Sequence, residues 1–132
     1  MNEIQMQVLE KKSDQYGEYL FAKTASSVRL ENLLTGLDYL AESKSLPRKL
    51  RILEDATEAI VDCSVSDFQV VLKRLKEVVA GFDSLHHAII QNSPKNTAFI
   101  MIFKGLILPK NYKIEVFSTH DAAMKWLNRN HV

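Results

Sequence analysis

The sequence predicts one α/β domain over residues 1–132, a mixed β-sheet packed by about four helices. Two observations predict this class. Segments with alternating polarity or short apolar runs take turns with segments whose apolar residues recur every three or four positions. The resulting order is β-β-α-β-α-β-α-β-α, with neither a linker nor an internal repeat to divide it. Strands that alternate with helices are typical of a largely parallel sheet covered by helices.

The first two segments predict a β-hairpin. Residues 3–12 alternate in polarity, which places Ile4, Met6 and Val8 on one face of a half-buried strand. The turn SDQYG, in which Gly17 can adopt positive φ, leads to a second strand in EYLFAKT.

A helix and a central strand come next. From Ser27 onward leucines recur every three or four residues, which predicts an amphipathic helix capped by Ser26 or Ser27 and ended by Pro47. The apolar run KLRILEDA predicts a buried strand, and TEAIVDCSV is interpreted as the connection that follows it.

The second helix has the clearest pattern in the chain. Ser66 and Gln69 form an S-x-x-Q capping box at its start. Its core stripe consists of Phe68, Val71, Leu72, Leu75, Val78, Val79 and Phe82. Lys73, Arg74, Lys76 and Glu77 lie off that stripe and indicate a solvated face.

Two further strand–helix pairs complete the chain. SLHHAIIQN predicts a buried strand, and Ser93 with Pro94 begins an apolar helix that Pro109 ends. YKIEVF alternates as a last strand, and a Ser118-x-x-Asp121 box begins the C-terminal helix.

Composition excludes several classes of function. Seventeen basic and sixteen acidic residues give a net charge of +1 without a basic cluster, so we expect no nucleic-acid partner. Cys63 is the one cysteine and no signal peptide is visible, which favours the cytoplasm. The most apolar run, residues 98–108, is too short to span a bilayer. No phosphate-binding loop or other cofactor motif is present, so we expect neither a cofactor nor a catalytic residue.

The C-terminal segment YKIEVFSTHDAAMKWL carries a family resemblance. Its strand ends in Val-Phe and is followed by an acidic helix start, an alanine and Trp-Leu; here these positions are Val116, Phe117, Asp121, Ala122 or Ala123, Trp126 and Leu127. With the order of elements, this pattern resembles the STAS superfamily, the anti-sigma-factor antagonist fold. The closer resemblance is to its SpoIIAA-like branch, also described as STAS/SEC14-like. It implies a non-enzymatic binding module, with a regulatory role as one form.

The same resemblance bears on the turn DCSV. Classical antagonists carry Asp-Ser-Ser-Gly or Asp-Ser-Thr-Gly there, and a partner kinase phosphorylates the first hydroxyl residue. Here Asp62 matches the aspartate, Cys63 replaces the phosphorylated residue, Ser64 is the second hydroxyl and Val65 replaces the glycine. Ser64 is therefore the candidate phosphosite, and Asp62, Cys63, Ser64 and Ser66 form a candidate anion or partner contact. The alternative is an ordinary helix cap by Ser64 or Ser66.

Other polar groups suggest chemistry only weakly. His86 and His87 are neighbours on a strand and point to opposite faces, so they cannot easily share a metal ion, and we predict no metal site. An acidic group, Glu54, Asp55, Glu58 and Asp62, follows the central strand and is interpreted as solvated loop residues. Its use in an enzyme is the weakest hypothesis.

The apolar run 98–108 leaves almost no polar face for a surface helix. It can be core, a homodimer contact, or the wall of a lipid site with peripheral membrane contact. The candidate apolar-ligand residues are Phe99, Ile102, Phe103 and Leu106. Two hypotheses result. A protein-interaction module that docks through the polar face of the second helix predicts a filled interior, whereas a carrier of a small apolar or lipid ligand predicts a cavity of several hundred Å³.

Overall fold

The computed structural model describes residues 7–129, and these contain one five-stranded sheet in the order β1-β2-β3-β4-β5. Strands β1 (Gln7–Asp14) and β2 (Gly17–Val28) form the predicted antiparallel hairpin. Strands β3 (Lys49–Val61), β4 (Ser84–Ile90) and β5 (Tyr112–Phe117) then add in parallel. The predicted order of elements and the mixed sheet are confirmed.

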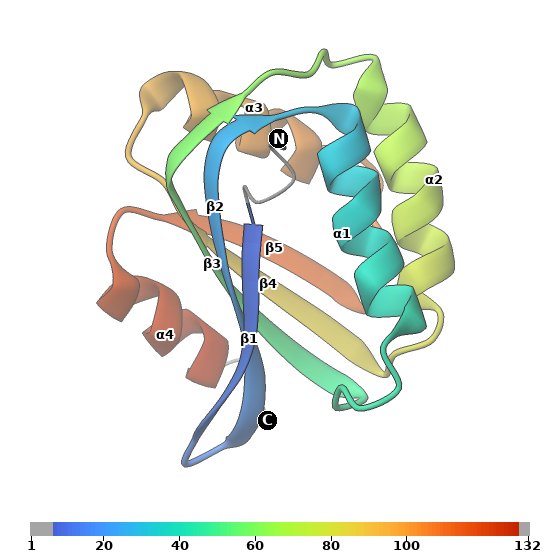
Figure 1. The fold of residues 1–132 in the computed structure, drawn as a ribbon, viewed down its shortest axis with the longest axis vertical. Coiled ribbons are helices and arrows are strands. Elements are labelled where there is room, and N and C mark those ends of the chain that lie inside the picture. Colours follow the sequence, from blue (N-terminus) through green and yellow to red (C-terminus); the bar gives the residue numbers. More distant parts are fainter. Residues whose placement is uncertain (1–6, 130–132) are drawn as a thin grey trace.

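Four helices cover the two faces of this sheet. Helices α1 (Leu30–Glu42), α2 (Asp67–Val79) and α3 (Pro94–Lys104) pack on one face, while α4 (His120–Arg129) packs on the other (Figure 1). Each of the first three helices connects two neighbouring parallel strands. Because such connections are right-handed, strands added in one direction leave their helices on one face.

The sheet therefore separates two hydrophobic clusters. On the α1–α3 side, Ile52 of β3 and Leu85 of β4 meet the predicted stripe of α2, of which Phe82 alone is only partly buried. On the α4 side, Leu53 and Ala88 meet Ala123 and Leu127, the latter two completely buried. Ile52 and Leu53 are adjacent and face opposite clusters, as alternation in a strand requires.

Two predicted boundaries in the first half are wrong. β2 continues to Val28, so Ser26 and Ser27 belong to a strand and the N-cap of α1 is Arg29. β3 likewise continues to Val61, so most of TEAIVDCSV is strand. The two extensions pair with each other in parallel, with Val28 opposite Val61. The pairing of the two strand extensions outweighs the local signals for helix capping, because those signals carry no information on a partner strand.

Helix ends also differ in part from prediction. Ser66 occupies the N-cap of α2, but its side chain makes no cap hydrogen bond; the Asp67 carboxylate instead accepts from the backbone N–H of Ser64 at 2.9 Å. At α3, the predicted cap is confirmed, because Ser93 Oγ accepts from the N–H of Asn96 at 3.3 Å. That helix ends at Lys104, before the predicted stop at Pro109.

One buried arginine connects the hairpin to the rest of the fold through hydrogen bonds. Arg51 is 1% exposed, and its guanidinium donates to both carboxylate oxygens of Asp14, at 2.8 and 2.9 Å. It also donates to Asn128 Oδ1 near the end of α4, at 2.8 Å, and to the carbonyl oxygen of Gly17, at 3.0 Å. Gly17 itself has a φ of 108°, the positive value predicted for the hairpin turn. A charge so buried depends on all of these acceptors.

We predict that Arg51→Ala destabilises the fold by about 3–5 kcal/mol, because it removes a buried guanidinium and leaves the Asp14 carboxylate without it. The matched control is Arg48→Ala. Arg48 also pairs with an aspartate, Asp83, but both side chains are largely exposed, so the expected loss is about 0–1 kcal/mol. Urea unfolding of both variants measures the difference. Equal losses would contradict the structural role given to Arg51.

Candidate functional site

A cavity of about 290 Å³ lies between α1 and the sheet and extends to α3. Most of its wall is apolar, with Leu33 and Leu37 of α1 facing Ala22 and Ile52 of the sheet. Both leucines belong to the core stripe predicted for α1, yet both are only partly buried. The hollow beneath the helix explains this incomplete burial. Its volume is close to the lower end of the range usual for small-molecule sites.

The sheet contributes a row of polar side chains to this cavity. Thr24, Glu54, His87 and Tyr112 come from the adjacent strands β2, β3, β4 and β5, and all four line the cavity. They share a face because each occupies an inward position in its own strand, as Ile52 and Glu54 do two residues apart in β3. We call these four residues the polar row.

The polar row is joined by short hydrogen bonds. Glu54 Oε1 lies 2.7 Å from His87 Nε2, and Glu54 Oε2 accepts from the Thr24 hydroxyl at 2.7 Å. The other ring nitrogen of His87, Nδ1, lies 3.2 Å from the hydroxyl oxygen of Tyr112. Each of the three bonds joins neighbouring strands, so the row runs across the sheet without a gap.

The surroundings set the protonation of the two acids in the row. Burial opposes ionisation of Glu54, but the hydrogen bond and charge of His87, with the bond from Thr24, outweigh it, so the pKa of Glu54 lies below its usual value. Burial, followed by the charge of Glu54, raises the pKa of Tyr112 far above the physiological range. The row therefore contains a carboxylate anion and a neutral phenol.

The interpretation of the acidic group as loop residues is wrong for three of its members. Glu54, Asp55 and Glu58 all lie in β3, and Glu54 is the partly buried centre of the polar row. Asp55 accepts from the hydroxyl and N–H of Thr57, and Glu58 pairs with Lys23 at the surface. The four residues do not converge on one cleft.

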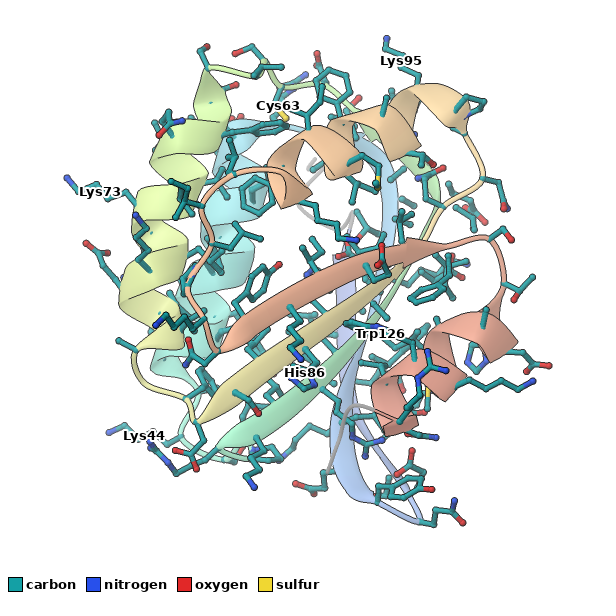
Figure 2. The ribbon with its side chains drawn as sticks, turned by 180° about the vertical axis from the view of Figure 1, so that it is seen from behind. Lys44, Cys63, Lys73, His86, Lys95 and Trp126 are labelled. Carbon is teal, nitrogen blue, oxygen red and sulfur yellow. The ribbon has the colours of Figure 1, made fainter. Side chains whose placement is uncertain are left out.

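The two neighbouring histidines point to opposite faces, as predicted. His87 faces the cavity, whereas the His86 ring lies 6.1 Å from the ring of Trp126 on the α4 side, measured between centroids (Figure 2). Among residues 7–129, no group of three or more His, Cys, Asp or Glu side chains could hold a metal ion.

Part of the predicted apolar-ligand set reaches the cavity. Phe99 and Phe103 line it, and each ring packs edge-to-face with the ring of Phe68, with centroids 6.2 and 5.5 Å apart. Ile102 is 46% exposed on the outer side of α3, and Leu106 lies beyond the helix against the core. Neither of these two lines the cavity.

The inward face of α3 follows ordinary helical spacing. Phe99, Ile100 and Phe103 line the cavity, and Asn96 one turn earlier is buried. Asn96 is polar because it completes the backbone of β3, donating to the carbonyl of Ala59 at 2.9 Å and accepting from the N–H of Val61 at 3.2 Å. Ile100 was missed because a run apolar on all sides does not indicate which side is buried.

The DCSV turn forms a surface corner beside the cavity. Cys63 lines the rim, and burial, with the charges of Asp67 and Asp62, raises the pKa of its thiol, so it is not an activated nucleophile. Ser64 and Ser66 are exposed, with their hydroxyl oxygens 2.7 Å apart. The Asp67 carboxylate accepts the hydrogen bond from the backbone N–H of Ser64 and so occupies the position where an anion would bind. Phosphorylation of Ser64, and an anion or partner contact here, stay predictions.

The polar face of α2 is in part used within the fold. Lys73 projects away from the protein (Figure 2), whereas Arg74 pairs with Asp38 of α1 at 2.8 Å and with Glu77 at 3.1 Å. Arg74 thus joins α1 to α2. Docking of a protein partner on this face stays a prediction.

No helix within residues 7–129 has the length and apolar character needed to cross a bilayer. Ile107, which follows α3, is 88% exposed.

Comparison with known proteins identifies the fold. A crystal structure of an uncharacterized protein of the DUF3478 family from Shewanella loihica PV-4, described as having a SpoIIAA-like fold, superposes on this chain with a TM-score of 0.63. The alignment covers 92% of this chain and 93% of that one, at 20% sequence identity. The chain has a SpoIIAA-like fold. The predicted resemblance is thereby confirmed at the level of fold.

No protein-family model matches the sequence, and no curated protein matches it. At this identity the SpoIIAA-like neighbour shows the fold alone. A role for the chain therefore has to be argued from its own residues.

We predict that the side-chain carboxyl of Glu54 titrates below pH 4.5, its ordinary value. Since the folded-state pKa is the lower one, the ionised pair stabilises the fold fully above the unfolded value, and this stability is lost as the pH falls through the folded value. Carbon-13 NMR of the carboxyl group measures the midpoint, and Glu54→Gln identifies the resonance by removing it. A midpoint above 4.5 would show that burial outweighs the His87 pair.

Proposed function

We propose that this SpoIIAA-like chain is a non-enzymatic binding module that holds a small, largely apolar molecule in the cavity beneath α1. The cavity itself is the observation that carries the proposal, because a module that works only through its surface predicts a filled interior. A cavity of about 290 Å³ lined by leucine, isoleucine and phenylalanine exposes apolar surface within the fold. A bound molecule would remove that apolar surface from water, which favours binding.

The size of the cavity limits the size of its ligand. Apolar cavities of roughly 150 Å³ bind benzene, a ring of about six non-hydrogen atoms. A volume of about 290 Å³ is therefore suited to roughly ten to twelve such atoms. Phe68, Phe99 and Phe103 line one side of the cavity, and such a group of aromatic rings favours a flat or ring-containing molecule.

Binding is better supported than catalysis. A general base needs a nitrogen or oxygen within reach of the substrate proton. In His87 one ring nitrogen bonds to Glu54 and the other to Tyr112, so neither is left for a substrate. The lowered pKa of Glu54 makes its carboxylate a weak base. The nearby thiol of Cys63 has a raised pKa and is not a reactive thiolate.

We predict that naphthalene, with about ten non-hydrogen atoms, binds the protein and that Leu37→Trp abolishes this binding, because the larger ring fills the hollow that Leu37 lines. Saturation-transfer NMR of the ligand measures binding. Ala41→Trp is the matched control, since Ala41 is exposed on the same helix and does not line the cavity. It should bind naphthalene like the wild type.

Two outcomes would contradict the proposed function. One is the absence of naphthalene binding to the wild-type protein. The other is equal binding by both tryptophan variants, which would place the ligand elsewhere. Circular dichroism of the two variants checks that each remains folded.

A further inference from the structure

The hydrogen atoms of the polar row can be assigned from its own geometry. Glu54 is ionised and can only accept, so the bond of 2.7 Å to His87 requires a hydrogen on Nε2. When the imidazole is neutral, the other nitrogen, Nδ1, carries no hydrogen and is an acceptor. The Tyr112 phenol keeps its proton and donates it to Nδ1 at 3.2 Å. Thr24 donates its own hydroxyl hydrogen to Glu54 at 2.7 Å.

Every hydrogen of the row is thus directed along the row, from Tyr112 to His87 and from His87 and Thr24 to Glu54. What remains for the cavity are acceptor positions. A carboxylate has about four lone-pair positions, and His87 and Thr24 use two of those on Glu54. The phenol oxygen of Tyr112 also keeps lone pairs. Glu54 retains 17% of its side-chain surface although it lies deep in the protein, and it lines the cavity.

We infer that the cavity selects an uncharged molecule carrying one hydrogen-bond donor, an alcohol or a phenol, and that this donor bonds to the carboxylate of Glu54. The inference rests on the proposed function and specifies its ligand. The hydroxyl hydrogen would meet an acceptor at the polar row, while the rest of the molecule contacts the apolar wall.

The charge of the row excludes the two ionic alternatives. A ligand carboxylate would meet the Glu54 anion at close range in an apolar cavity, where like charges repel strongly. A ligand ammonium would be attracted to the Glu54 anion, but it would lose its water shell in an apolar cavity, and His87 and Thr24 already occupy two of the lone-pair positions on that carboxylate. An ether of the same size would present an oxygen to acceptors and leave its own oxygen unpaired.

Gln91, a further buried polar residue in the wall, is engaged with backbone. It donates to the carbonyl of Ala56 at 2.6 Å and accepts from the N–H groups of Asn92 and Ser93 at 2.9 Å. Its carbonyl oxygen thus holds the turn after β4. Gln91 is thereby excluded as the contact for the ligand's polar atom.

The test is a series of naphthalenes with one substituent changed, measured by ligand NMR at about pH 8, the upper end of the range in which histidines usually titrate. We expect 2-naphthol to bind about tenfold or more tightly than 2-methoxynaphthalene, because only 2-naphthol can donate a hydrogen bond to the charged acceptor. We expect 2-naphthoate and 2-naphthylmethylammonium to bind more weakly than 2-naphthol.

Glu54→Gln provides the decisive variant, because an amide at position 54 brings donors to the cavity and removes the charge. In this variant the preference for 2-naphthol over 2-methoxynaphthalene should fall several-fold. Glu58→Gln, on the exposed part of the same strand, is the matched control and should keep the wild-type preference.

The outcomes separate this inference from the proposed function. If naphthalene binds but 2-naphthol has no advantage, or if 2-naphthoate or the ammonium binds best, the inference is wrong and the cavity remains a binding site. If Glu54→Gln keeps the full preference, the donor does not bond to Glu54. If no member of the series binds, the proposed function fails and the inference fails with it.

Discussion

The buried carboxylate of Glu54 is the constraint around which this side of the sheet is arranged. An ionised carboxylate away from water is costly unless its oxygens are bonded, and here His87 and Thr24 supply the bonds from the two neighbouring strands. The pairing of β3 with β4 brings Ile52 opposite His87, so that Glu54, two residues on, can reach the ring. A slip of one residue would turn His87 to the α4 face and leave Glu54 unpaired. Strand register and the polar row therefore stabilise each other.

The cavity follows from the same arrangement. The leucine stripe of α1 needs an apolar surface opposite it, but the middle of the sheet offers Glu54 and His87 there. Close packing of leucines on the Glu54 carboxylate would remove its remaining contact with solvent at a cost. On the other face the buried charge is that of Arg51, which is enclosed by hydrogen-bond acceptors from the hairpin and α4. The small side chains of Ala88 and Ala123 let α4 pack closely on that face. One face is therefore filled and the other is hollow.

The fold could be predicted from the sequence because its signals are local. Each signal depends on residues only a few positions apart. Examples are the hydrophobic period, Gly17 at the hairpin turn, and Ser93 with Pro94 at the start of α3. The boundaries that failed, at Val28 and Val61, are fixed by a partner strand about thirty residues away. Such pairing has no local signature.

The candidate site could be predicted only in part, for a related reason. Phe99 and Phe103 were found because they belong to a conspicuous apolar run, whereas Ile102 in the same run faces outward. Glu54 was grouped with Asp55 and Glu58, its neighbours in the chain, although its partners are Thr24 and His87, 30 and 33 residues away. Period alone cannot identify such a group. One signal was present: Glu54 follows Ile52 and Leu53 directly in a buried strand, where an acid requires a partner.

The likeness to a SpoIIAA-like structure and the polar row therefore carry different information. The order of elements and the apolar stripes produce the fold, and a protein 20% identical shares it. The polar row needs four particular side chains on four adjacent strands, which neither the order of elements nor the apolar stripes specify. Two proteins with this fold can thus have the same cavity wall and select different ligands. The hydrogen-bonding capacity of Glu54, rather than the fold, is what would set the specificity of this chain.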